Sequence, residues 1–164
     1  MPKCVLFAAC GDVSIDMYTN RVSLFMLIEQ VQPVIVAGPD VPDGSTRAYV
    51  PEMVILTQWR RLYGEDGKRF SQKIEVVAPD GKHTVIQEPM EFTLKTLFHR
   101  LLHRTGYLGV RSYGEFSFKV FLKPAESDEW GEPASEFVFV VEEIPIVHDA
   151  QVQQNEEHLE EFAM

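Results

Sequence analysis

Two apolar runs between residues 114 and 141 constrain the fold of this chain more than any other feature. The first run alternates apolar with polar residues, apart from Phe121 on the polar face, and its inward set is Phe116, Phe118, Val120 and Leu122. A period of two places one set on a core and the other in water, so this run predicts a half-buried strand. The second run, 137–141, is apolar at every position, as expected for a strand covered on both faces. Together they predict the central hairpin of an antiparallel sheet.

Further strands are predicted before this hairpin. They are expected at 5–9, 22–31, 53–62, 70–78 and 84–92, the last interrupted at Pro89, with an edge strand at 34–37. Segment 22–31 carries apolar residues on both faces, so we expect it in the interior. Pro79-Asp80-Gly81 has the composition of a tight turn.

One segment changes period. From residue 93 to 104, apolar residues recur at helical spacing, at Leu94, Leu97, Phe98, Leu101 and Leu102. Thr93 can cap the start of a helix and Gly106 its end. We therefore predict one amphipathic helix near 93–104, packed through its leucine stripe.

Short strands separated by turns predict a mainly β protein. We expect an antiparallel β-sandwich, immunoglobulin-like or C2-like in the broad sense, with the single helix in one connection. An α+β sheet with the helix across one face is the alternative. A chain of 164 residues suits one domain, which we place at 1–147, followed by an acidic C-terminal tail at 148–164.

The charge of the chain narrows the choice of partners. A formal net charge of −10 argues against nucleic-acid and anionic-membrane binding, since both need a basic surface. The charge is uneven, because 124–164 holds twelve acidic residues and no Lys or Arg. This segment either neutralises basic segments within the fold or presents an acidic surface to a basic protein partner.

The two cysteines indicate a compartment. Cys4 and Cys10 are too few for a disulfide scaffold, and six residues of one strand would separate them by roughly 20 Å. The apolar run at 5–9 is shorter than the core of a signal peptide, and no stretch reaches transmembrane length. We expect reduced thiols and a cytoplasmic protein.

Four segments carry a resemblance: Cys10-Gly11-Asp12-Val13, Asn20-Arg21-Val22-Ser23-Leu24, residues 74–82, and Gly114-Glu115-Phe116-Ser117-Phe118. Their order resembles a family of small uncharacterised bacterial proteins of unknown function that are thought to be β-sandwiches. The resemblance covers Met1 to about Val147 and implies a fold but no activity. Gly11 stands where the family pattern leads us to expect a second acid, which weakens a metal site there.

Two pairs of residues could bind a metal. His99 and His103, four apart on the predicted helix, would point the same way, but the Glu of a metalloprotease helix is missing and Arg100 and Arg104 would repel a cation. We therefore predict that these four residues form a solvated or partner-facing basic face. Asp12 and Asp16 could bind Mg²⁺ or Ca²⁺ through oxygen, although two carboxylates fit turn formation better.

No catalytic motif is recognisable, so we predict a non-catalytic protein-interaction module or assembly subunit, without metal or cofactor, that binds a protein or a second copy. A small metal-dependent hydrolase using Asp12 and Asp16, or His99 and His103, is the alternative. Trp130 lies in a polar loop and is a candidate residue for contact with a partner. It is also the sole basis for a weaker hypothesis, that the protein binds a sugar. In the tail, Leu159 and Phe162 would share one side of a helix and are candidate partner contacts.

Overall fold

The computed structural model describes residues 1–16, 18–19, 21–36 and 47–143, and within these ranges the chain forms strands and turns but no helix. The strands are β1 (Lys3–Ile15), β2 (Val22–Leu27), β3 (Gln30–Val31), β4 (Val34–Val36), β5 (Arg47–Val50), β6 (Val54–Arg60), β7 (Arg69–Val77), β8 (His83–Thr93), β9 (Phe98–Arg104), β10 (Leu108–Val110), β11 (Gly114–Pro124) and β12 (Ser135–Val141). The prediction of a mainly β protein is confirmed.

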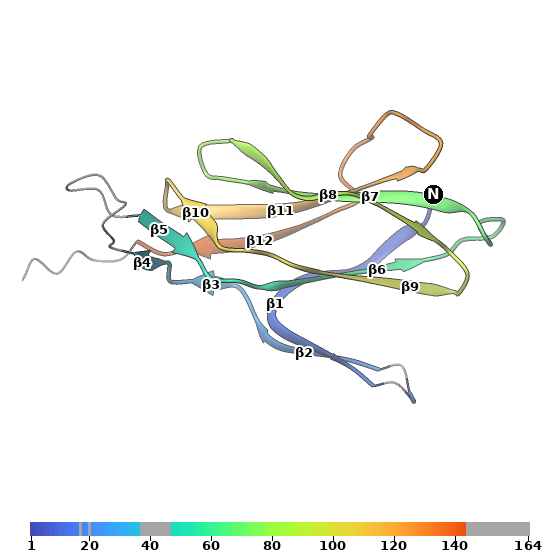
Figure 1. Ribbon diagram of the computed structural model, residues 1–164, viewed down its shortest axis with the longest axis horizontal. Helices are drawn as coiled ribbons and strands as arrows, with labels where there is room; N and C mark the ends of the chain where they lie inside the picture. Colours follow the sequence, from blue (N-terminus) through green and yellow to red (C-terminus); the bar gives the residue numbers. More distant parts are fainter. Residues whose placement is uncertain (17, 20, 37–46, 144–164) are drawn as a thin grey trace, which may run out of the picture.

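The strands form three sheets (Figure 1). A four-stranded sheet has the order β2-β1-β6-β9, and a five-stranded sheet has the order β3-β12-β11-β7-β8. A three-stranded sheet, β10-β5-β4, stands at one end of the molecule. All pairings are antiparallel except the short one between β12 and β3.

The predicted central hairpin is confirmed. β11 pairs with β12 so that Phe116 lies opposite Phe139, and β11 is the middle strand of its sheet. Phe139 stacks on Phe118 at 4.8 Å between ring centroids. The expectation that residues 137–141 are covered on both faces is wrong, because Val138 and Val140 are exposed. A run of valines fits an exposed strand face as well as a buried one, since β-branched residues favour strands in either place.

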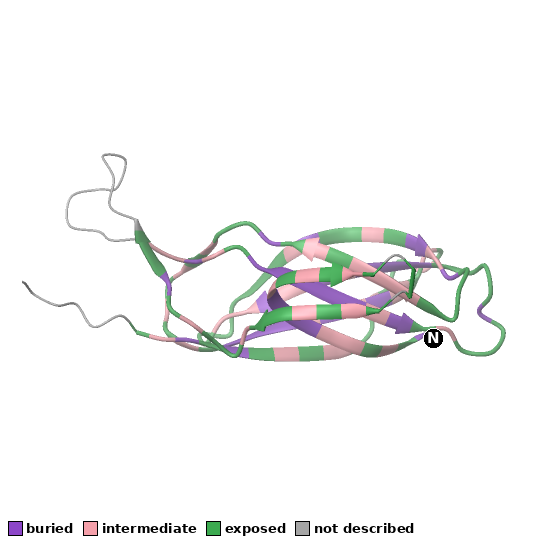
Figure 2. Ribbon diagram, turned by 90° about the horizontal axis from the view of Figure 1, so that it is seen from below, coloured by how far each residue is buried: buried purple, intermediate pink, exposed green. Residues whose placement is uncertain are grey.

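The core lies between the four-stranded and five-stranded sheets, and buried residues gather in the middle of the molecule (Figure 2). Gln72 on β7, itself buried, connects the two sheets at the centre of this core. Its Oε1 accepts hydrogen bonds from Trp59 Nε1 at 2.7 Å and Thr57 Oγ1 at 2.8 Å, both on β6. Its Nε2 donates to Gln87 Oε1 on β8 at 2.8 Å. Trp59 is fully buried as a result, with its only polar atom paired.

The predicted helix at 93–104 is wrong. Residues 98–104 form β9, which pairs along its whole length with β6 and is an edge of the four-stranded sheet. Leu94 is fully buried before the strand begins, whereas Leu97 and Leu102 are exposed, so the leucines form no continuous stripe. The free edge of β6 offers hydrogen-bond partners to this segment, and that tertiary pairing overrides its local helical spacing.

The predicted strand at 22–31 exists but is not interior. It divides into β2 and β3, and most of β2 faces solvent. Two smaller expectations fare differently. Val34–Val36 is an edge strand as predicted. β8 continues past Pro89, but its pairing with β7 shifts register between Gln87 and Met90, so the predicted interruption takes the form of an irregularity in the ladder of an edge strand.

Candidate functional site

The second half of β1 and the whole of β2 form a hairpin that projects from the two facing sheets (Figure 1). Asp16 shapes its turn: the carboxylate Oδ1 accepts hydrogen bonds from Thr19 N at 2.6 Å and Tyr18 N at 2.9 Å. These bonds, led by the one from Thr19, lower the pKa of the Asp16 carboxyl. Asp12 likewise accepts a bond from Val13 N at 2.8 Å. Asp16 therefore has the turn-forming role, whereas Asp12 lies within β1 opposite Phe25 of β2.

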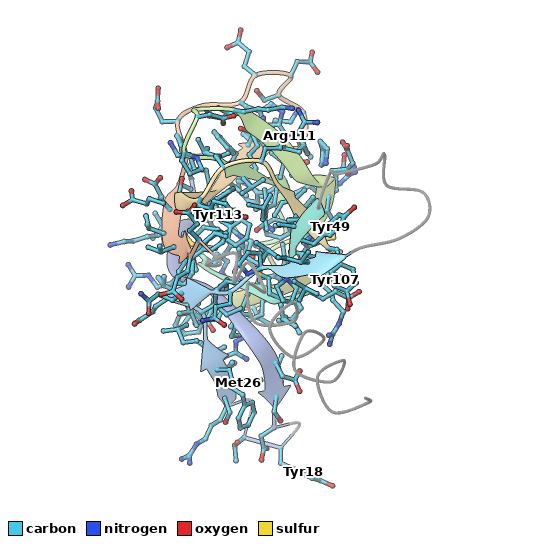
Figure 3. All side chains as sticks on the ribbon, turned by 90° about the vertical axis from the view of Figure 1, so that its left-hand side faces the viewer. Tyr18, Met26, Tyr49, Tyr107, Arg111 and Tyr113 are labelled. Carbon is cyan, nitrogen blue, oxygen red and sulfur yellow. The ribbon has the colours of Figure 1, made fainter. Side chains whose placement is uncertain are left out.

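Three consecutive apolar residues on this hairpin are exposed. The exposed fractions are 49% for Phe25, 74% for Met26 and 51% for Leu27. Tyr18, fully exposed, lies at the tip (Figure 3). We call Tyr18 and Phe25–Leu27 the apolar arm. Successive side chains of a strand point to opposite faces of the sheet. Three consecutive exposed side chains therefore show that neither face of β2 is covered here.

Met26 has an unusual backbone. Its φ of 54° lies in the left-handed region, which costs a residue other than glycine on the order of 1 kcal/mol. Gly11 accommodates the side chain on the neighbouring strand, since a Cβ at Gly11 would lie 2.5 Å from Met26 Cε. Strain at an exposed apolar residue is typical of a functional position.

β2 is also an edge strand, because in the described part of the chain it pairs only with β1. Edge strands are usually protected by charged residues or proline, which discourage pairing with another chain. The six residues of β2 are Val-Ser-Leu-Phe-Met-Leu and include neither. This edge therefore has the composition of one that another chain covers.

The two histidines do not form a basic face. They lie on a strand, where four residues span about 13 Å, too far for one metal ion to bridge. His99 stacks on Phe92 with ring centroids 4.7 Å apart, and His103 Nε2 is buried without a hydrogen-bond partner in the described structure. Burial lowers the pKa of both imidazoles. β9 turns both imidazoles toward the interior, where they are half-buried, and their contact with a partner stays a prediction.

The neighbouring arginines point elsewhere. Arg100 Nε donates to Gln58 Oε1 at 2.6 Å across the β6–β9 pair, while Arg104 is exposed at the end of β9. Alternation along the strand thus separates His99 from Arg100 and His103 from Arg104. The four residues that helical spacing predicted to be together are not a single surface.

Trp130 lies back against the five-stranded sheet. Lys73 Nζ lies 5.0 Å and Lys123 Nζ 5.1 Å from its ring centroid, an arrangement that favours cation–π attraction. Lys73 also pairs with Glu75 at 2.6 Å. Trp130 is half-buried by these contacts, and the structure shows it as part of the outer face of β7 and β11.

Other predicted residues have simpler outcomes. Cys4 and Cys10 both lie on β1 as free thiols, and burial raises the pKa of each. Leu159 and Phe162 fall outside the described residues. Within the described ranges, no three His, Cys, Asp or Glu side chains gather as metal ligands would, and no helix has the length and hydropathy needed to cross a membrane.

Sequence reasoning missed the apolar arm. The signal was present, since β2 is apolar at five of its six positions and contains no charge. However, a continuous apolar run does not determine how a strand is buried. The same pattern occurs in a strand covered on both faces by its own chain and in an exposed strand that binds another protein. Only the placement of β2 at a sheet edge distinguishes the two.

Comparison with protein-family models, curated proteins and solved structures found no match for this chain. Among the described residues, the apolar arm is the feature that points most directly to a function.

Proposed function

We propose that this protein is a non-catalytic protein-interaction module, built as a β-sandwich, that binds its partner through the apolar arm. The observation that carries the proposal is the consecutive exposure of Phe25, Met26 and Leu27 on an unprotected edge strand. Burying the exposed half of three such side chains would contribute on the order of 3 kcal/mol, which is about a hundredfold in affinity.

The partner is a different protein rather than a second copy. Each copy has a formal net charge of −10, so self-association would bring together two strongly acidic molecules. Around the arm, Asp12, Asp16 and Glu29 outnumber the one cation, Arg21. An apolar surface with a basic rim complements this arrangement in both hydrophobicity and charge.

Strand addition is the mode of binding that suits β2. Its outer edge runs from Val22 to Phe25 before the left-handed Met26 bends the backbone. A partner strand pairs with this straight part, and the side chains of Met26 and Leu27 occupy pockets beyond it. Backbone hydrogen bonds then supply affinity while the apolar side chains supply specificity.

We also propose a cellular compartment and a source for the protein. Two free thiols on one strand suit a reducing compartment, so we place the protein in the cytoplasm. The resemblance to small bacterial β-sandwich proteins supports a bacterial source.

The experiment is site-specific photo-crosslinking in the native host. A benzophenone side chain replaces Phe25, and in a matched control it replaces Val85, which is 44% exposed on the edge strand β8 of the other sheet. We expect one dominant adduct from position 25 that position 85 does not give. The captured protein is then purified and mixed with this chain, and Phe25→Ser should weaken the binary complex at least tenfold.

Two outcomes would contradict the proposal. An adduct of twice the mass of this chain, accompanied by dimers in light scattering, would show that the arm binds a second copy. Equal adducts from both positions would show that the arm is not a specific surface.

A further inference from the structure

A pocket of about 260 Å³ lies at the end of the molecule that carries the three-stranded sheet. Residues of β5, β10, β11 and β12 line it, together with β7, β8 and the turn between them. Arg111 at the pocket and Met26 on the apolar arm lie on opposite sides of the end view (Figure 3). The pocket is therefore separate from the surface proposed above.

The floor of the pocket is apolar and rigid. Phe116 and Phe139 form one wall, with ring centroids 5.6 Å apart and planes inclined by 27°. Both rings are buried, as are Val50 and Val76 beside them. These four side chains belong to the core, so the pocket walls are held by packing in the absence of any ligand.

The mouth of the pocket is charged. Lys82 and Arg111 line it, both exposed, and among the described residues neither forms an ion pair. Asp80 also lines the pocket, and its carboxylate accepts a hydrogen bond from Lys82 N at 3.0 Å within the β7–β8 turn. Two cations and one carboxylate leave the mouth with one excess positive charge, in a chain whose formal net charge is −10.

We propose that this pocket binds a small apolar carboxylic acid, with the hydrocarbon part against Phe116 and Phe139 and the carboxylate at Arg111 and Lys82. A guanidinium offers a planar pair of donors that matches a carboxylate, and one excess charge suits a monoanion. Removing water from a dianionic phosphate costs more than removing it from a monoanion, and one excess positive charge at the mouth does not offset that cost. A water molecule occupies about 30 Å³ in the liquid, so a pocket of about 260 Å³ has room for an aromatic ring or a short acyl chain.

The test is calorimetric titration of the full-length protein with phenylacetate and octanoate. Phenylacetamide and octanamide are the uncharged controls, and phenyl phosphate is the dianionic one. We expect saturable binding of at least one acid, with its amide and phenyl phosphate each at least tenfold weaker. NMR of the protein should show the largest shifts at the methyl groups of Val50 and Val76.

Variants then locate the site. Arg111→Gln should weaken binding of the acid on the order of tenfold, as the loss of a charge-assisted hydrogen bond does. Arg60→Gln removes an exposed arginine at the end of β6 and should leave binding unchanged. Both positions are exposed, so both variants should fold, which melting curves will verify.

The proposal is overturned if no acid binds saturably, if amides or phenyl phosphate bind as tightly as the acids, or if Arg111→Gln and Arg60→Gln have equal effects. None of these outcomes bears on the apolar arm.

Discussion

Gln72 holds a position that few side chains could take. It accepts from Trp59 and Thr57 on one sheet and donates to Gln87 on its own sheet, all within a buried core. A buried polar group without a partner costs about 1–3 kcal/mol, so the network is stable only when every member is present. Gln72 therefore fixes the alignment of the two sheets as well as contributing stability.

Replacement of Gln72 tests this role. We predict that Gln72→Leu lowers the free energy of unfolding by about 3 kcal/mol, because Trp59 Nε1 and the Gln87 amide lose their partner. Urea unfolding followed by tryptophan fluorescence measures the change. Gln30→Leu, at an exposed position on β3, is the control and should stay within about 0.5 kcal/mol. A loss below 1 kcal/mol for Gln72→Leu would show that water replaces the network.

The inward histidines give the protein a predictable response to acid. Burial lowers the pKa of His99 and His103 below the ordinary value of 6.5, so the unfolded chain takes up protons before the folded one does. Their contribution to stability is complete above pH 6.5 and is lost as the pH falls through the window below it. The sign is opposite to that of a histidine paired with a carboxylate.

His99→Phe separates this effect from general acid unfolding. Phenylalanine keeps the ring stacked on Phe92 but cannot be protonated. We predict that the melting temperature of the variant falls less than that of the wild type between about pH 7 and pH 5.5, by the linkage of proton uptake to unfolding. Parallel curves for the two proteins over this range would show that His99 takes up protons equally in the folded and unfolded states, so that burial does not lower its pKa.

At the scale of elements, β9 is where sequence and structure disagree most. In a helix, Leu97 and Leu101 would share one buried face, but in β9 and the turn before it Leu97 is 55% exposed while Leu101 packs against the core. We predict that Leu101→Asp strongly destabilises the protein and that Leu97→Asp changes its stability by less than about 1 kcal/mol. Circular dichroism and thermal melting of the two variants are sufficient. Equal destabilisation would restore the helical interpretation.

The sequence predicted elements well where one pattern had one meaning. Alternation at residues 116–122, broken only at Phe121, led to the correct pairing partner and the correct place in the sheet, and turns such as Pro79-Asp80-Gly81 were located by backbone chemistry. It failed where a pattern is shared by two structures. The leucine spacing at 94–102 fits a helix locally, but the open edge of β6 decides its state, and no local signal reports on that edge.

The candidate site was predictable only in part. Asp16 was noticed as a carboxylate after the first strand and Trp130 as an aromatic residue in a polar loop. The turn-forming role expected for Asp16 matches the contacts observed. The apolar arm was not predicted from the sequence, because the exposure of its side chains depends on which strand lies at the sheet edge. The pocket was invisible for the same reason: Arg111 and Phe139 are 28 positions apart and meet only through the strand order.

At the scale of the whole molecule, two surfaces of different character lie apart. The apolar arm is convex, unprotected at its edge and bordered by acids, which suits a macromolecule. The pocket is concave, with a rigid aromatic wall and a cationic mouth, which suits a small anion. The core between the two facing sheets supports both surfaces, and the hydrogen bonds of Gln72 hold the two sheets in alignment.

Strand addition at β2 is tested by hydrogen–deuterium exchange of this strand in the free protein and in the non-covalent complex with the partner identified by cross-linking. An edge strand leaves every second amide without a partner, and strand addition pairs those amides. We predict that exchange across Val22–Phe25 slows at least tenfold on binding, while β8, the edge of the other sheet, exchanges at its free rate. Unchanged exchange across Val22–Phe25 in a saturated complex would show that no strand is added to β2.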